Sequence, residues 1–316
     1  MAEPSTGRTT RIWRDGQFVA WDDATIHVMS HAVHYASSVF EGIRCYETPG
    51  GSAIFRAADH MRRLRDSCRI YRMPLRYDLD TLVQAASDTV NANDLRHCYL
   101  RPIVVRTGEQ MGVYGVDAPV ETFIIAWNWG SYLGDEALQH GVDVCVSSWR
   151  RAAPDTFPGL AKASGNYLSS QLSKMEARIN KYSEGIMLDS FGHVAEGSGE
   201  NLFVVKDGVI FTASLGASIL KGITRDSVMV IARDLGYEVR EEAIPRELLY
   251  IADEAFFSGT AAELTPIRSV DRIQVGDGRP GAITCAIQTQ YMGICKGELE
   301  DRFGWLTMVP DTVTIA

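Results

Sequence analysis

Two Asp-Gly pairs, Asp15-Gly16 and Asp207-Gly208, each stand between short runs rich in aromatic and β-branched residues. The surrounding stretches are RIWRDGQFVAW near the start and NLFVVKDGVIF in the second half. Asp-Gly between such runs is the strongest short-range signal for a tight antiparallel hairpin. The chain is therefore predicted to build antiparallel sheet in both halves.

Helical patterns interrupt these strands. ADHMRRLRDSCRIY has Asp59 as its expected N-cap, and TRDSVMVIARDLG is expected to run from a Thr224 cap to a stop at Gly236. Because strands and helices do not alternate strictly, the predicted fold class is mixed α/β, of the α+β kind. Another helix is expected where an apolar stripe recurs, at Leu168, Leu172, Met175, Ile179 and Tyr182.

A chain of 316 residues suggests two domains, at about 150 residues per domain. Glycine and polar residues in GSYLGDEALQHG separate two strand-rich runs. We therefore expect a small α/β domain at 1–128, an interdomain linker at 129–136 and a larger domain at 137–316.

The charge balance argues against nucleic-acid binding, since 31 basic and 40 acidic residues leave a net charge of −9. The densest basic stretch, MRRLRDSCRIYR, has helical periodicity and is expected to be a solvated helix face. Neither a signal-peptide core nor an apolar run of about 18 residues is present. The six cysteines include no C-x-x-C pair, so we expect reduced thiols in a cytoplasmic protein.

A lone lysine, Lys162, stands among small and apolar residues in TFPGLAKASGNYLSSQL. Burial would lower its pKa from about 10.4 toward neutrality and free the amine to attack carbonyls. Small neighbours such as Gly159, Ala161 and Ala163 leave room for a flat ligand. The alternative is a lysine that extends to solvent at a helix start.

A carboxylate, Glu196, stands beside a Gly-Ser-Gly turn in HVAEGSGENLFVV. A carboxylate next to a pyridine nitrogen keeps that nitrogen protonated and makes the ring an electron sink. The alternative is a turn carboxylate that accepts backbone N–H groups.

Two small-residue turns, KGITRD and SGTAAEL, suit a phosphate. The first opens a helix at Ile223 and Thr224, where free N–H groups and the positive end of the helix dipole face outward. The second offers the Thr260 hydroxyl. A third glycine-rich stretch, GDGRPG, is expected to be only a turn. Three histidines, His27, His31 and His34, have helical spacing, but the segment around them is a poor helix former and a metal site is not expected.

The segments HVMSHAVHYASSVFEGIRCYE, YLRP, WGSYLG, SSWRRAAPDTFPGLAKASGNYLSS, EGSGENLF, GITRD and DEAFFSGTAAELTPIRSVD occur in this order from Trp13 to Trp305. In these motifs the chain resembles the class IV pyridoxal-phosphate aminotransferases, specifically branched-chain amino acid aminotransferases of the bacterial type. The resemblance implies a fold-type IV enzyme whose small N-terminal α/β domain and larger, cofactor-binding C-terminal domain bury pyridoxal 5′-phosphate between them, with two chains sharing the active sites.

The resemblance also implies the roles of individual residues. Lys162 forms the Schiff base with the cofactor, Glu196 pairs with the pyridine nitrogen and Tyr167 with the ring oxygen. The phosphate is held by Arg56, Thr260 and the backbone of Ile223 and Thr224. The substrate cleft is lined by Tyr35 from the partner chain and by Phe40, Tyr99, Arg101, Trp129, Tyr132 and Ala261.

The predicted reaction is transamination between leucine, isoleucine or valine and 2-oxoglutarate. Three alternatives with the same fold stay open: a D-amino acid aminotransferase, an (R)-selective amine aminotransferase and an aminodeoxychorismate lyase. So do two other classes, a cofactor-free amidase using Lys162 with Ser164 or Ser169, and a non-catalytic scaffold.

Overall fold

The computed structural model describes residues 8–130 and 133–310. These residues form two compact units. Unit 1 contains the N-terminal residues to Gly130, the short segment Ala161–Gly165 and the C-terminal residues from Gly293, and unit 2 contains the rest. The domain boundaries expected from the sequence stay a prediction, whereas the mixed α/β class with antiparallel sheets is confirmed.

Unit 1 is built on an eight-stranded sheet in the order β18-β5-β4-β6-β7-β1-β2, with β3 paired to β6. The predicted hairpin at Asp15-Gly16 is confirmed as β1 and β2. Its strands are β1 (Arg11–Arg14), β2 (Gln17–Ala20), β3 (Ser38–Phe40), β4 (Ile43–Thr48), β5 (Gly51–Phe55), β6 (Cys98–Arg106), β7 (Val120–Trp127) and β18 (Leu306–Met308).

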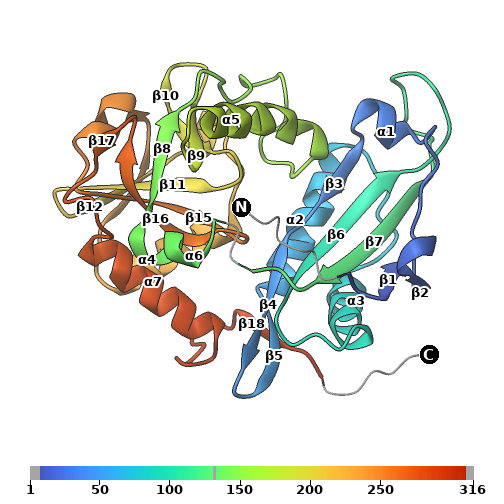
Figure 1. Cartoon of the computed structure of the whole chain (residues 1–316). Helices are drawn as coiled ribbons and strands as arrows, with labels where there is room; N and C mark the ends of the chain where they lie inside the picture. Colours follow the sequence, from blue (N-terminus) through green and yellow to red (C-terminus); the bar gives the residue numbers. More distant parts are fainter. Residues whose placement is uncertain (1–7, 131–132, 311–316) are drawn as a thin grey trace. The chain divides into compact units, whose positions relative to one another are not determined.

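Helices α2 and α3 lie together against this sheet (Figure 1). Helix α2 buries His60, Met61, Leu64, Ser67 and Cys68, which recur at helical spacing. The helices of unit 1 are α1 (His31–Tyr35), α2 (Ala57–Ile70) and α3 (Leu79–Ala92), with a 3₁₀ turn η1 (Trp21–Asp23).

The expected N-cap of α2 is wrong. Arg56 occupies that position in a left-handed conformation with φ +50°, and its N–H donates to the Trp305 carbonyl at 2.6 Å. Asp59 instead lies in the first turn, where its carboxylate accepts from Arg56 Nε at 2.7 Å. The basic stretch is also not wholly solvated, because the Arg63 side chain is only 12% exposed.

Unit 2 is built on a ten-stranded sheet in which the pairing of β10 with β11 closes β11-β15-β16-β8-β9-β10 into a barrel. The predicted hairpin at Asp207-Gly208 is confirmed as β11 and β12. The strands are β8 (Val142–Val146), β9 (Glu184–Leu188), β10 (His193–Gly197), β11 (Asn201–Lys206), β12 (Val209–Ala213), β13 (Val239–Glu242), β14 (Ile244–Pro245), β15 (Glu254–Gly259), β16 (Glu263–Val270) and β17 (Ile273–Gln274).

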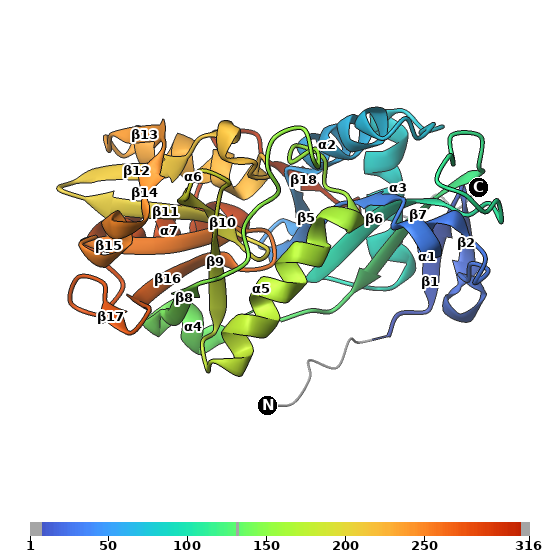
Figure 2. The same ribbon diagram turned by 90° about the horizontal axis from the view of Figure 1, so that it is seen from above.

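Helix α5 (Tyr167–Ile179) runs beside β9 in Figure 2. Its buried face consists of Ser170, Ser173 and Ala177, so the predicted apolar stripe is not what packs. Leu168, Met175 and Ile179 of that stripe are exposed. The other helical segments are α4 (Asp135–His140), α6 (Ile223–Asp234) and α7 (Ala282–Cys295), with η2 (Ser164–Asn166), η3 (Leu215–Ala217) and η4 (Arg246–Tyr250).

Helix α4 begins inside the stretch expected to be a linker, whose residues 131 and 132 lie outside the described part of the chain. Helix α6 is capped by Gly222 rather than by Thr224, because Thr224 is already its second helical residue. The chain does leave the helix before Gly236, as predicted, with Gly236 at φ +86°.

Candidate active site

The segment that carries Lys162 packs into unit 1 like a short extra strand. Its N–H donates to Ser67 Oγ on α2 at 3.0 Å, and its carbonyl accepts from the Phe40 N–H at 3.0 Å. The neighbouring Ala163 forms an isolated antiparallel bridge with Val39. Ala161 and Ala163 are buried in the core of the unit, so small side chains are what allow this close approach.

The amine of Lys162 faces a mixed apolar and charged surface. Its Nζ lies 4.9 Å from the centroid of the Phe40 ring. Burial and the nearby Arg63 guanidinium lower the pKa of Lys162 from 10.5 to about 8, against the opposing pull of Glu41. A lysine with this pKa has a usable neutral fraction near neutral pH and can act as a nucleophile or base.

Further aromatic rings and one arginine pack around Phe40, the ring that the Lys162 amine faces. The Arg101 guanidinium lies 4.7 Å from the Phe40 ring centroid and 5.5 Å from that of Tyr99. Tyr99 packs edge-on against Trp129 at 4.7 Å. A Cβ at Gly42 would come within 1.8 Å of the Tyr99 hydroxyl oxygen, so a glycine is needed there. The structure therefore brings four of the expected substrate residues together: Phe40, Tyr99, Arg101 and Trp129.

Two expected site residues of the first half, Tyr35 and Arg56, are not part of this cluster. Tyr35 is 37% exposed at the end of α1, and its hydroxyl accepts the Gly112 N–H at 3.0 Å. Arg56 pairs with Asp59 and lies 5.4 Å from the Trp305 ring. Tyr132 lies outside the described residues.

Two charged residues that sequence reasoning missed lie beside Lys162. Glu41 and Arg63 form a buried ion pair, with Arg63 Nε 2.7 Å from Glu41 Oε1. Helical spacing offered one signal, because Arg63 lies on the same face of α2 as the buried His60 and Ser67.

In unit 2, Glu196 lies on strand β10 and is only 6% exposed. Its Oε2 accepts from Asn201 Nδ2 at 2.9 Å and from the Leu220 N–H at 3.1 Å. Its Oε1 lies 3.1 Å from Arg151 Nε. This carboxylate is therefore held by two side chains and a distant backbone group. Arg151 and Asn201 were missed in the sequence.

The start of α6 lies against the same Asn201. A Cβ at Gly222 would come within 1.9 Å of Asn201 Oδ1, so only glycine allows this approach. The first N–H groups of a helix have no partner within the helix, and Ile223 and Thr224 supply two of them here.

The turn after β15 begins next to these residues, since Asn201 is the register partner of Ser258. Thr260 and Ala261 are half-buried in that turn. Tyr167 is the half-buried first residue of α5. Within unit 2 the motifs EGSGEN, KGIT and SGTA thus lie side by side.

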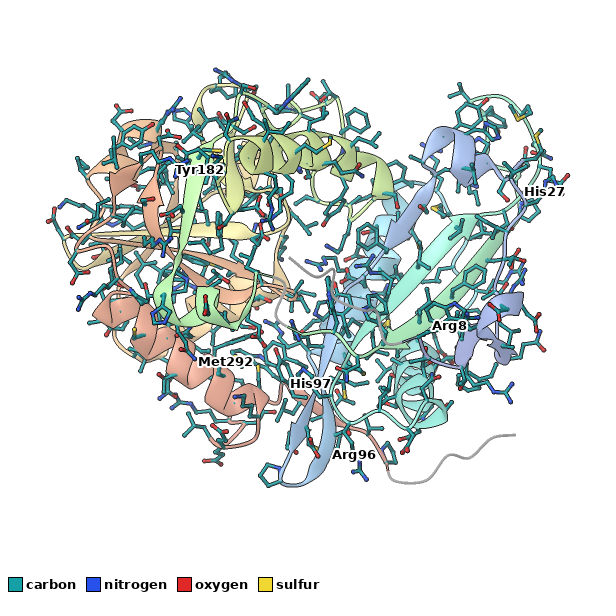
Figure 3. The ribbon with its side chains drawn as sticks, in the orientation of Figure 1. Arg8, His27, Arg96, His97, Tyr182 and Met292 are labelled. Carbon is teal, nitrogen blue, oxygen red and sulfur yellow. The ribbon has the colours of Figure 1, made fainter. Side chains whose placement is uncertain are left out.

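The three histidines, His27, His31 and His34, each contact a different partner. His31 Nε2 is 3.1 Å from the Gly112 carbonyl, and His34 Nε2 is 3.1 Å from that of Val28. His27, labelled in Figure 3, lies at the edge of unit 1 with Glu109 at 3.7 Å. Across residues 8–130 and 133–310, no group of three His, Cys, Asp or Glu is placed to hold a metal ion. Nor does any helix within those ranges combine the length and apolarity needed to cross a bilayer.

The chain is similar over most of its length to proteins of known kind. A branched-chain-amino-acid aminotransferase of Salmonella typhimurium is 53% identical over 306 residues, covering 96% of this chain and 99% of that protein. A crystal structure of the Escherichia coli branched-chain amino acid aminotransferase has a TM-score of 0.92 and 52% identity, covering 96% of this chain and 100% of that one.

A third relative, the branched-chain amino acid aminotransferase of T.th., complexed with N-(5′-phosphopyridoxyl)-L-glutamate, gives a TM-score of 0.91 at 42% identity. With 4-methylvaleric acid the same protein gives 0.91 at 41%, and both structures cover 96% of this chain and 100% of theirs. The family model for amino-transferase class IV matches residues 38–270. The chain therefore belongs to the class IV amino-transferases, as one of the branched-chain amino acid aminotransferases.

Proposed function

We propose that this chain transfers the amino group between branched-chain L-amino acids (leucine, isoleucine and valine) and 2-oxoglutarate, with pyridoxal 5′-phosphate as cofactor and Lys162 as its Schiff-base residue. One observation carries the assignment of Lys162. Its amine, with a pKa lowered to about 8, faces Phe40 within a cluster of aromatic rings and one arginine.

When bound, the cofactor supplies the electron sink that makes the substrate's α-carbon acidic. With the cofactor bound, the Lys162 amine would act as the base that takes the proton from the substrate's α-carbon and would return it on the cofactor side. A base held beside the carbon avoids the entropy cost of a collision, which contributes up to about 7–11 kcal/mol.

The donor set of unit 2 fits the other groups of the cofactor. Glu196, aimed by Asn201 and Arg151, suits a protonated ring nitrogen. Tyr167 would hold the ring oxygen. The N–H groups of Ile223 and Thr224, with the Thr260 hydroxyl, suit a phosphate.

The expected cation for the phosphate was Arg56, but Asp59 and Trp305 engage it. The phosphate arm of pyridoxal phosphate is attached to the ring carbon next to the one that bears the aldehyde. A cation close to Lys162 is therefore better suited, and Arg63 is such a cation. We assign the phosphate to Arg63 in preference to Arg56.

The side chains proposed to line the substrate site suit both aliphatic and acidic substrates. Phe40, Tyr99 and Trp129, with Ala261 and Tyr132, would line an apolar wall for aliphatic side chains, and Arg101 offers a cation for a carboxylate. The T.th. relative is known in complexes with a phosphopyridoxyl-glutamate and with 4-methylvaleric acid, which has an aliphatic chain. We further propose a cytoplasmic homodimer, or a multiple of dimers, in which Tyr35 reaches the partner's pocket.

Borohydride reduction tests the assignment directly. The purified protein with pyridoxal phosphate is expected to absorb in the visible and to bleach on reduction, and peptide mapping should find the label on Lys162. A label on Lys174, Lys181 or Lys206 would refute that assignment. A panel of amino donors against 2-oxoglutarate, with D-amino acids and (R)-amines as controls, tests the substrate class.

A further inference from the structure

A fully buried carboxylate, Glu41, lies at the centre of a charged network in unit 1. Arg63 donates to it through Nε at 2.7 Å and through Nη2 at 2.8 Å, and His60 Nδ1 lies 2.7 Å from Glu41 Oε2. The exposed fractions are 0% for the Glu41 side chain, 1% for that of His60 and 12% for that of Arg63. These contacts hold the pKa of Glu41 far below its usual range, although burial alone would raise it.

His60 is the neutral member of the network. Burial is the largest cause of its lowered pKa and outweighs the attraction of Glu41. An ionised carboxylate can only accept hydrogen bonds, so His60 donates its Nδ1–H to Glu41. The network therefore contains one negative charge, on Glu41, and one positive charge, on Arg63.

A charge pair of this kind is a poor way to stabilise a fold. Removing two charges from water costs several kcal/mol per ion, and apolar residues of similar size are often as stable or more so. The position of the Glu41–Arg63 pair is better explained by the Lys162 segment next to it.

The backbone of Lys162 is bonded on both sides to residues next to this pair. Phe40, which precedes Glu41, donates its N–H to the Lys162 carbonyl, and Ser67, four residues after Arg63 on α2, accepts the Lys162 N–H. Residues four apart share a helix face, so Arg63 and Ser67 both face the lysine segment.

We propose that Glu41 is a positioning residue of the active site, which fixes the Arg63 guanidinium beside the Lys162 amine and balances its charge there. Glu41 favours the ammonium form of Lys162 and Arg63 disfavours it. Other titratable or charged groups of unit 1 that act on this amine include His60 on α2 and Tyr99 and Arg101 on β6. The functional importance of this balance rests on the proposed role of Lys162.

The test is a titration of Lys162 in cofactor-free protein, followed by NMR with ¹³Cε-labelled lysine and assigned with Lys162→Met. Glu41→Gln should lower the midpoint by about 1 pH unit, because the amine loses an anion that favours its charged form. Arg63→Gln should raise it by about as much. Glu184→Gln serves as the control, because Glu184 is also fully buried and paired with a cation, Lys174.

Each single variant leaves one buried charge without its partner, which can prevent folding. The double variant Glu41→Gln/Arg63→Gln is therefore included, since replacing both partners destabilises a fold less than removing one of them. Its midpoint should lie close to that of the wild type, because the opposing effects cancel. Unchanged midpoints in folded single variants, or shifts of the same sign, would overturn the proposal and leave a purely structural pair. The titration needs neither cofactor nor turnover, so failure of the proposed function would show separately in the borohydride experiment.

Discussion

Glu196 and Asn201 face each other as register partners where β10 and β11 close the barrel, and the Asn201 amide donates to Glu196 Oε2 at 2.9 Å. The same amide donates to the Leu220 carbonyl at 3.0 Å. One side chain thus joins the closure of the barrel, the carboxylate proposed for the ring nitrogen and the loop that leads into α6.

Replacement of Asn201 by aspartate tests this link. The variant loses both donated hydrogen bonds and places a carboxylate against Glu196, so we expect a loss of about 1–3 kcal/mol in the free energy of unfolding at pH 7. Urea denaturation of cofactor-free protein measures it, with the exposed Asn128→Asp as control. A loss no greater than in the control would show that the amide does not hold Glu196.

The sequence predicts local structure well where the signal is itself local. Both Asp-Gly hairpins lie where expected, because the turn chemistry and the strands it joins are contiguous. The cap residues of α2 and α6 were misplaced, since Arg56 and Gly222 take those positions through contacts with Trp305 and Asn201. Distant contacts of this kind leave no mark on a local pattern.

The candidate site divides in the same way. The small residues around Lys162 predicted room for a flat ligand, which stays a prediction, and in the structure Ala161 and Ala163 are buried in the core of unit 1. Helical spacing marks Arg63 as a candidate for the buried face of α2, but no local pattern pairs it with Glu41, which follows a strand 22 residues earlier. The exposed stripe on α5 shows the converse, since Leu168 and Ile179 have the right spacing but small residues form the buried face.

Lys162→Met should stabilise the cofactor-free protein at neutral pH. The folded-state pKa of about 8 is depressed from 10.5, so the unfolded state binds more protons between these values and wild-type stability rises with pH across that window. Methionine has no charge to desolvate, so the free energy of unfolding should rise by up to about 3 kcal/mol at pH 7, and this gain should shrink toward pH 10.5. Urea denaturation at pH 7 and pH 10 measures the difference in free energy of unfolding between variant and wild type. A difference that does not change with pH would contradict a lowered pKa of Lys162 in the folded protein.

Glu200→Gln should also stabilise the protein, with the opposite pH dependence. Burial first, and then the Glu184 carboxylate, raise the pKa of Glu200 to about 8. A raised pKa contributes stability that is present below the unfolded value of 4.5 and lost as pH rises toward 8. The variant's advantage should therefore grow from pH 4.5 to pH 8, to the order of a few kcal/mol. Thermal unfolding at both pH values checks this, with the exposed Glu242→Gln as control.

The last prediction concerns a pocket that must accept an aliphatic side chain and then the anionic side chain of glutamate. An apolar pocket rejects a carboxylate, because an unpaired buried charge costs several kcal/mol. Arg101 is placed to resolve this conflict. Its guanidinium lies among the rings of Phe40, Tyr99 and Trp127, the last at 5.9 Å, and aromatic faces stabilise a cation. Its buried Nε has no hydrogen-bond partner among the residues that the structure describes.

The rings would hold the charge of Arg101 while leucine is bound, and the guanidinium would bind the γ-carboxylate when glutamate replaces it. Arg101→Ala should then raise KM for glutamate and 2-oxoglutarate by about 10–100-fold, or about 1.4–3 kcal/mol, the range of a charge-assisted hydrogen bond. The half-reaction with leucine should change by several-fold at most. Arg101→Lys is the matched variant, since it keeps the charge but loses the planar fork, and it should recover part of the glutamate affinity. Steady-state kinetics with each donor and single-turnover half-reactions measure the effects. Equal losses for leucine and glutamate would instead assign Arg101 to the α-carboxylate that both substrates share.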